Sequence, residues 1–499
     1  MTNKILKTTL AGVLAVISAA SFVPGTAVGN AFAPAAITAS AESSYNDFTY
    51  DNLSDGTVVI TKYNGSSSSV EIPSEINGQK VTKIGNNAFL MKSVITEVKI
   101  PDTVAEIGEF AFGNLSALTK IVVPDSVKSI GRGAFVGCSQ LKDVTLSKNL
   151  TTLGQGVFQR CTSLAKIVIP SGVKSIEGFT FQECSALTSV SLPSSLTYIG
   201  KKAFFECDKL TGAAIPDGVK EIDEYAFCNC KSLEMLLLSS ALTTIGDSAF
   251  SNCESLSELS LPSKLKTIGM NAFANCKNIT SLVLPDSVTE VGVMAFTNCH
   301  GITSVKLSKN LTAISKGAFI STGITEITIP EGVTSIDSVA FYTCKSLAKV
   351  NLPKSLTSVG EKAFGACDSL AKVQYSGTKA QFAAVTVGDD NEALTGAAYT
   401  YGSSSSNAYP VVTGVEYDTK NHKFRIKWTP VSGAKYYGIA VYRSGKWKAQ
   451  VQNIPSTTTT FTSPKLKAGQ TYKVAVCAKV NGKWDTSSIS KRAVTVTVK

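Results

Sequence analysis

The sequence predicts two folds in one chain of 499 residues: a solenoid of stacked short units, followed by an all-β sandwich. The first observation is a repeat of 23 residues, with one step of 22, that places a phenylalanine at the same phase of every unit. Repeats of this kind are typical of solenoids, in which each unit packs only on its neighbours. The second observation is that short alternating segments replace the repeat near the C-terminus. The repeated residues are Phe89, Phe112, Phe135, Phe158, Phe181, Phe204, Phe227, Phe250, Phe273, Phe296, Phe319, Phe341 and Phe364.

Each unit joins an alternating apolar segment to a compact turn, as in LTKIVVPDSVKSIGRGAFVGCSQL at residues 118–141. The alternation predicts a short strand that Pro124 ends, because proline has no amide hydrogen to give to a ladder. A short helix or 3₁₀ turn is expected to begin at Gly131, since the Gly, Asp and Ser found at this phase all begin helices well. The Phe, Cys and Leu that follow at intervals of three then share one face of that turn.

The chain has twelve cysteines, and most of them occupy one phase of the repeat. Stacked in parallel register, their side chains point the same way, whereas a disulfide or a tetrahedral metal site needs side chains that converge. We therefore expect buried free thiols and no metal site. Cys228 lies outside this column and is expected to be exposed, while Cys477 is the single thiol of the C-terminal domain. The column consists of Cys138, Cys161, Cys184, Cys207, Cys230, Cys253, Cys276, Cys299, Cys344 and Cys367.

The segments outside the repeat have distinct compositions. Basic residues, an apolar run from Leu10 to Val23 and the small residues Ala39-Ser40-Ala41 predict a secretory signal peptide. The following segment predicts a capping hairpin with its turn near Asn64–Gly65. The expected organisation is a signal peptide at 1–41, an N-terminal cap hairpin region at 42–80, repeats at 81–375, a C-terminal cap at 376–400, a Ser-rich linker at 401–408 and a β-sandwich at 409–499.

Positive charge is concentrated in the last segment. Residues 409–499 hold 16 Lys and Arg against 3 Asp and Glu, a net charge of +13, whereas the rest of the chain holds 32 against 34, a net charge of −2. For an exported domain this charge favours anionic cell-wall polymers, lipid head groups or acidic glycans over nucleic acid, although a basic domain that is merely soluble is an equal alternative. The basic surface candidates are Lys423, Arg425, Lys427, Arg443, Lys446 and Lys448.

The sequence shows no set of residues with the types and spacing that a catalytic site needs. The two histidines, His300 and His422, fall in different predicted domains, and the carboxylates recur with the repeat instead of pairing across a cleft. The sequence has no glycine-rich phosphate loop and no calcium loop. We therefore expect no catalytic residues, no metal and no cofactor.

The remaining functional candidate is the surface formed by the outward positions of the repeated strands. These positions become apolar at Gly212, Ala214, Met235 and Leu237. An exposed apolar patch with a polar rim can mark a protein interaction site, while the alternative is that strands simply favour apolar residues. These four residues are the predicted binding site.

The unit resembles the BspA-like leucine-rich repeat, through the fixed phase of Ile-Gly, Ala-Phe and Cys over residues 57 to 400. Trp428 and Tyr472, in segments such as KFRIKW and TYKVAVCAKV, make residues 409–499 similar to a fibronectin type III domain. The resemblance implies a secreted or bacterial cell-surface binding protein without enzyme activity. It implies an adhesin whose solenoid recognises a host extracellular-matrix or microbial surface protein or glycan. The alternative is an accessory component of the cell envelope that binds wall polymer through its basic C-terminal domain, in either case with no transmembrane segment in the mature chain.

Overall fold

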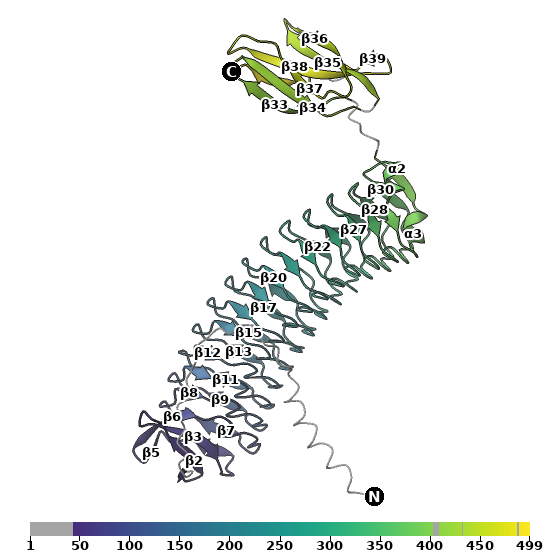
Figure 1. The fold of residues 1–499 in the computed structure, drawn as a ribbon. Helices are drawn as coiled ribbons and strands as arrows, with labels where there is room; N and C mark the ends of the chain where they lie inside the picture. The colour runs from purple at the N-terminus through teal and green to yellow at the C-terminus, as the bar shows by residue number, and fades with distance from the viewer. Residues whose placement is uncertain (1–42, 403–408, 432, 487–488) are drawn as a thin grey trace.

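The repeats coil into a gently curved solenoid of about 15 turns (Figure 1). The computed structural model describes residues 43–402, 409–431, 433–486 and 489–499. The predicted signal peptide and nearly all of the Ser-rich linker lie outside the described residues. The described chain has two separate hydrophobic cores, one within the solenoid and one within the C-terminal sandwich.

The predicted strand is present in every repeat unit except the one that contains residues 258–260, and strands that pair do so in parallel with a step of one repeat, as in Lys120↔Asp143. The middle residue of the strand points into the core and its two neighbours point outward, which confirms the predicted alternation. These strands are β4 (Ser69–Glu71), β7 (Glu97–Lys99), β9 (Lys120–Val122), β11 (Asp143–Thr145), β13 (Lys166–Val168), β15 (Ser189–Ser191), β17 (Gly212–Ala214), β19 (Met235–Leu237), β22 (Ser281–Val283), β24 (Ser304–Lys306), β26 (Glu326–Thr328), β28 (Lys349–Leu352), β30 (Lys372–Tyr375) and β32 (Ala398–Tyr401).

Each turn also contains a second, shorter strand that the sequence did not reveal. Except in the longer β6, it consists of two residues ahead of the repeated glycine position, such as Ser129–Ile130, which pairs in parallel with its equivalents in both adjacent turns. These strands are β6 (Gln79–Ile84), β8 (Glu106–Ile107), β10 (Ser129–Ile130), β12 (Thr152–Leu153), β14 (Ser175–Ile176), β16 (Tyr198–Ile199), β18 (Glu221–Ile222), β20 (Thr244–Ile245), β21 (Thr267–Ile268), β23 (Glu290–Val291), β25 (Ala313–Ile314), β27 (Ser335–Ile336), β29 (Ser358–Val359) and β31 (Thr386–Val387).

The expected helix or 3₁₀ turn at the Ala-Phe pair is wrong. The chain instead forms successive isolated turns in which the residue two before each Phe and the residue before each Cys take positive φ, as at Phe110 (52°) and Arg160 (61°). This geometry aims alternate amides at the next turn of the solenoid. Phe110 N–H donates to the Arg132 carbonyl at 2.8 Å, and Phe112 N–H donates to the Ala134 carbonyl at 2.8 Å. Hydrogen bonds between turns therefore replace the hydrogen bonds within a helix.

The solenoid core is organised around the repeated phenylalanines. From Phe89 to Phe364 each ring stacks on the next, with centroid distances from 4.8 Å for Phe204–Phe227 to 5.8 Å for Phe296–Phe319. The rings are fully or almost fully buried, and Tyr63 extends the stack at the N-terminal end. The stacked rings belong to one continuous hydrophobic core that runs through the solenoid.

Caps close both ends of the stack. At the N-terminal end β1 (Ser43–Tyr45), β2 (Phe48–Asn52) and β3 (Val58–Tyr63) form an antiparallel sheet, and β5 (Glu75–Ile76) pairs with β6. Hairpin turns join β1 to β2, β2 to β3 and β5 to β6, so the turn predicted at Asn64–Gly65 is wrong. At the other end α2 (Lys379–Phe382) and α3 (Glu392–Thr395) interrupt the strand pattern before β32.

The C-terminal domain is an all-β structure of two antiparallel sheets. One sheet contains β33 (Val412–Asp418), β34 (Lys423–Trp428) and β37 (Thr460–Thr462). The other contains β36 (Lys446–Pro455), β35 (Ala434–Arg443), β38 (Thr471–Val480), β39 (Lys483–Trp484) and β40 (Val494–Thr497). Trp428 is buried between the sheets against Tyr437, whose hydroxyl accepts a hydrogen bond from Val431 N–H at 2.7 Å.

Candidate binding face

The outward residues of the parallel strands β7 to β30 form one surface along the solenoid, which we call the strand face. Two columns of side chains run along it, because each three-residue strand offers its first and third residues to solvent. Strand pairing holds neighbouring side chains within contact distance, so the columns are continuous from turn to turn. Residues 258–260 occupy the turn between β19 and β22 without forming a strand, but Glu258 and Ser260 remain exposed.

The four residues of the predicted binding site lie together at the middle of the strand face. Gly212 pairs with Met235, and Ala214 pairs with Leu237, in the register of β17 and β19. The side chains of Met235 and Leu237 are 70% and 66% exposed. Two large apolar side chains therefore stand beside two positions with almost no side chain, which makes a ridge next to a trough.

Charge is distributed unevenly along the strand face. From Ser189 to Ser304 the outward positions carry one charged residue, Glu258. Both ends carry charges of mixed sign, with Glu97 and Lys120 toward the N-terminus and Glu326 and Lys349 toward the C-terminus. An apolar centre between charged ends is the usual anatomy of a protein–protein interface.

The side chains at the outward positions of β7 to β30 are apolar, hydroxyl-bearing, amide-bearing or charged, and none of them is aromatic. Besides the central patch, Val122, Val168 and Val283 are 48%, 68% and 55% exposed. Glycan sites depend largely on aromatic rings, which offer broad amphipathic contact surfaces. The strand face therefore offers apolar, polar and charged contacts without aromatic rings.

The repeated cysteines support the stack and offer no reactive site. All twelve cysteines of the chain are free and buried, as expected for the column but not for Cys228, which is only 5% exposed. Each column thiol donates to the carbonyl oxygen of the Phe one turn earlier, as from Cys161 to Phe135 at 3.2 Å. Burial raises the pKa of Cys138 and of Cys184 to about 12, so these thiols stay protonated and weakly nucleophilic at neutral pH.

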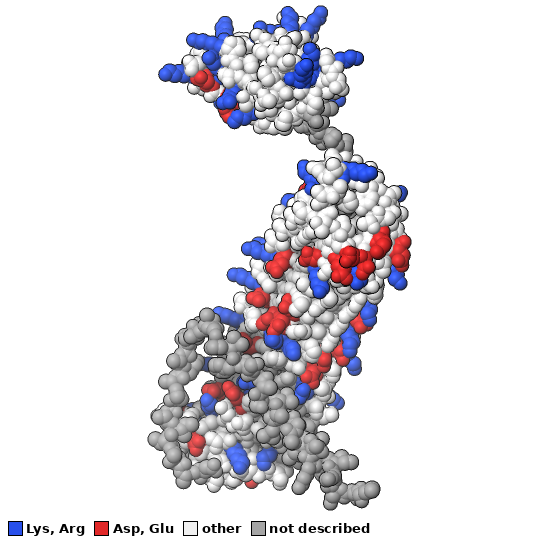
Figure 2. All heavy atoms as spheres, turned by 45° about the vertical axis from the view of Figure 1, so that its right-hand side comes forward, with Lys and Arg blue, Asp and Glu red and all other residues white. Residues whose placement is uncertain are grey.

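The basic surface candidates of the sandwich lie on both of its sheets. Lys423, Arg425 and Lys427 lie on β34 in one sheet, whereas Arg443, Lys446 and Lys448 lie on β35 and β36 in the other. Lys427 forms an ion pair with Glu416 at 2.8 Å. Figure 2 shows Lys and Arg side chains spread over the visible surface of this domain. Its positive charge is therefore a property of the whole domain.

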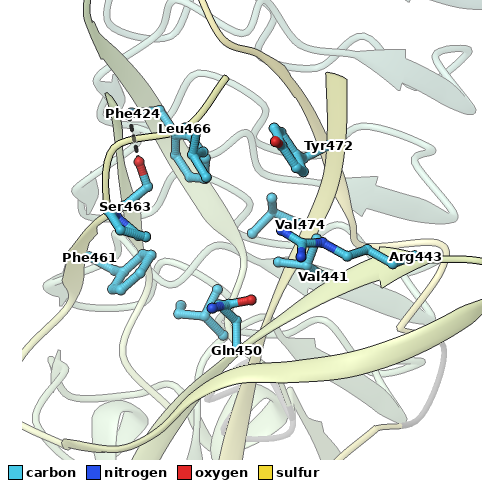
Figure 3. A pocket seen from close by; sticks show the side chains of 11 residues that line it. Phe424, Val441, Arg443, Gln450, Phe461, Ser463, Leu466, Tyr472 and Val474 are labelled. Atoms are coloured by element: carbon cyan, nitrogen blue, oxygen red, sulfur yellow. Dashed lines mark hydrogen bonds between the residues drawn. The ribbon is translucent and has the colours of Figure 1, made fainter. Parts of the chain in front are cut away.

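The sandwich contains a small slit between its sheets, lined by Phe424, Phe461, Leu466 and Val474, with Arg443 and Gln450 among its polar lining residues (Figure 3). Its volume is about 30 Å³, enough for one or two water molecules and too small for an organic ligand. The Arg443 guanidinium lies 5.5 Å from the centre of the Tyr472 ring. Tyr472 is half-buried, whereas Tyr437 is fully buried and its hydroxyl is hydrogen-bonded to the backbone.

The titratable residues do not assemble into a reactive centre in the described part of the chain. Within it, no three His, Cys, Asp or Glu side chains are grouped so as to hold a metal ion. His300 is exposed in a solenoid turn, and His422 lies in the turn before β34, with Nδ1 3.1 Å from the Lys499 carbonyl oxygen. None of the described residues forms a helix long and apolar enough to cross a membrane.

Comparison with known proteins identifies the family of the solenoid. The profile described as BspA type leucine-rich repeat region (6 copies) matches residues 62–187, 152–280 and 266–384, which together cover more than half of the chain. The chain belongs to this family of leucine-rich repeat proteins. Its repeats form a β-solenoid, in agreement with the architecture described above.

Solved structures similar to this chain include two leucine-rich repeat proteins and an Fn3-like protein. A leucine-rich repeat protein from Bacteroides ovatus is 30% identical with a TM-score of 0.58, over 72% of this chain and 99% of that protein. A leucine-rich cell-surface protein from Faecalibacterium prausnitzii is 30% identical with a TM-score of 0.47, over 70% of this chain and 99% of its own. An Fn3-like protein from Clostridium thermocellum is 26% identical with a TM-score of 0.14, over 15% of this chain and 80% of its own. The comparison with curated proteins gave no significant match.

Proposed function

We propose that the chain is a secreted or cell-surface binding protein, without enzyme activity, that acts as an adhesin through the strand face of its solenoid. The observation that carries this proposal is the exposed row of outward side chains with an apolar centre at Met235 and Leu237. Membership of the BspA-type family supports the location, because the Faecalibacterium relative with 30% sequence identity is a cell-surface protein. The predicted signal peptide at 1–41 is consistent with export.

The ligand class that best suits the strand face is a protein of the host matrix or of another microbe. Apolar side chains in the centre of an interface contribute most of the binding free energy once water is excluded, and the polar rim sets the register. Glycans are the less favoured ligand because the strand face lacks aromatic side chains at its outward positions.

The test is a binding screen of the mature chain against matrix proteins and glycans, followed by variants of the central patch. We expect the double variant Met235→Asp and Leu237→Asp to weaken binding at least tenfold, because two carboxylates would be desolvated at an apolar contact. Met270→Asp is the matched control, since Met270 is 45% exposed but lies off the strand face. Unchanged binding by a folded double variant would remove the central patch from the proposal.

A second candidate function is suggested by the net charge of +13 on residues 409–499. In this alternative the sandwich, which resembles a fibronectin type III domain, holds the protein to anionic wall polymer and the solenoid acts as a spacer. The whole chain should then sediment with purified cell wall at low salt and be released as salt rises, because screening weakens attraction between exposed charges. Retention that does not change with salt would contradict electrostatic binding by this domain.

A further inference from the structure

We propose that the strand face pairs with the strand face of a second copy, as a two-fold symmetric dimer with antiparallel solenoids. The dyad would lie parallel to the strands, between β17 and β19. This inference rests on the proposed function in one respect, which is that the strand face is a recognition surface. The partner it names for that surface is a second copy of the chain. In such an isologous contact each residue meets a different residue of the same patch in the other copy.

The apolar centre is self-complementary about this dyad. In the register of β17 and β19, the small residues Gly212 and Ala214 lie one turn away from the large residues Met235 and Leu237. A two-fold rotation places β19 of one copy over β17 of the other. Met235 and Leu237 of each copy then lie against Gly212 and Ala214 of the other copy. The large side chains of each copy therefore fill the space left by the small residues of its partner.

The charged ends are complementary about the same dyad. Strand β9 is the fifth turn before the dyad and β26 is the fifth turn after it, so Lys120 opposes Glu326 of the second copy. One turn further out Glu97 on β7 opposes Lys349 on β28. Within a chain Glu97 is paired in register with Lys120, and Glu326 forms an ion pair with Lys349 at 2.7 Å. At each end of the contact, Glu97 and Lys120 of one copy therefore meet Lys349 and Glu326 of the other copy. Each of these four charges has neighbours of opposite sign.

The intermediate turns fit the same arrangement. Val168 on β13 opposes Val283 on β22, since both are the third residue of their strands and lie three turns from the dyad. Asp143 on β11 and Lys306 on β24 meet diagonally in the fourth turn. No turn from β7 to β28 places like charges directly opposite each other.

Neighbouring registers lack this complementarity. Moving the dyad onto β17 would oppose Glu97 to Glu326 of the second copy. Moving it onto β19 would oppose Lys120 to Lys349 and Asp143 to Glu326. Like charges brought together at an interface are unfavourable, so the charge pattern selects one register out of three.

The size of the strand face sets the expected strength of the dimer. Twelve turns at a strand spacing of about 4.8 Å give a length of about 50 Å, and two outward columns give a width of about 10 Å. Such a contact buries at most about 1,000 Å² in total, because the curvature of the solenoid limits how evenly two copies meet, and this area is at the lower limit for a specific interface. We therefore expect a weak, reversible dimer whose population depends on concentration.

The test is sedimentation equilibrium of the full chain and its charge-reversed variants. Wild type is expected to show a monomer–dimer equilibrium that high salt weakens. Lys120→Glu and Glu326→Lys, each alone, place like charges at two symmetric positions and should raise the dimer Kd about tenfold. An equimolar mixture of the two variants should regain the wild-type Kd to within about twofold, because every opposed pair in the mixed dimer again has opposite signs.

The matched control is Lys174→Glu, because Lys174 is exposed in a turn away from the strand face. It should leave the Kd unchanged. A chain that stays monomeric at millimolar concentration, a Lys174→Glu effect equal to that of Lys120→Glu, or a mixture no stronger than the single variants would each overturn the inference. A monomeric wild type whose central-patch variant loses its ligand would leave the proposed function intact. If the wild-type chain dimerises and the double variant Met235→Asp and Leu237→Asp still binds its ligand, the proposed ligand site is wrong and the inferred dimer stands.

Discussion

Truncating one ring of the phenylalanine stack tests whether the solenoid depends on contacts between turns. Phe227 is fully buried, with the ring of Phe204 at 4.8 Å and that of Phe250 at 5.3 Å. Phe227→Leu keeps most of the apolar volume but loses two stacking contacts of about 0.5–1.5 kcal/mol each, so we expect a loss of about 1–3 kcal/mol. Phe227→Ala also leaves a cavity and should cost about 3–5 kcal/mol.

Chemical denaturation with two probes measures this loss. All three tryptophans lie in the sandwich, so their fluorescence follows that domain, while far-UV circular dichroism is dominated by the longer solenoid. We expect Phe227→Leu to lower only the solenoid transition. Phe205→Leu is the control, because Phe205 directly follows a stacked ring in the chain but is only half-buried. Equal effects of Phe227→Leu and Phe205→Leu, or an equal shift in tryptophan fluorescence, would refute the reasoning.

Single features of the structure lead to four other predictions. The native thiols should resist a thiol reagent at pH 8 until denaturant is added, because burial raises the pKa of Cys138, Cys184 and Cys299 to about 12; rapid reaction of several thiols would contradict this. The unfolded chain loses these protons near pH 9 while the folded chain keeps them, so denaturation curves should show stability falling from about pH 9 to about pH 12. Asn252 has φ of 61° and its amide group bonds Asn229 and Asn275, so Asn252→Ala should cost about 1 kcal/mol more than Asn252→Gly in thermal unfolding, and equal losses would argue against backbone strain. Arg492→Ala removes the cation of a largely buried ion pair with Asp485 and should destabilise the sandwich by about 3–5 kcal/mol, seen in tryptophan fluorescence and not in the solenoid transition.

Much of the candidate site could be predicted because it depends on period alone. The 23-residue spacing brings equivalent residues into neighbouring turns, and the strand alternation decides which of them face solvent. The juxtaposition of Gly212 with Met235, and of Ala214 with Leu237, follows from these two rules. The same rules could not place the basic residues of the sandwich, because a β-sandwich has no repeat and strands distant in sequence determine which sheet each side chain belongs to.

The sequence by itself determined which residues of the solenoid must be buried, since the stacked Phe rings and the thiol column occupy fixed phases of the repeat and cannot form a core within one unit. Only the tertiary structure decided which hydrogen bonds are made by the backbone between these buried residues. Bulky residues such as Phe110 and Tyr225 take positive φ against their local preference, because their amides then reach carbonyl groups of the next turn. The same stacking creates the two-residue strands and buries Cys228. The partners that stabilise these features lie a full turn away in the chain, so no local sequence pattern predicts them.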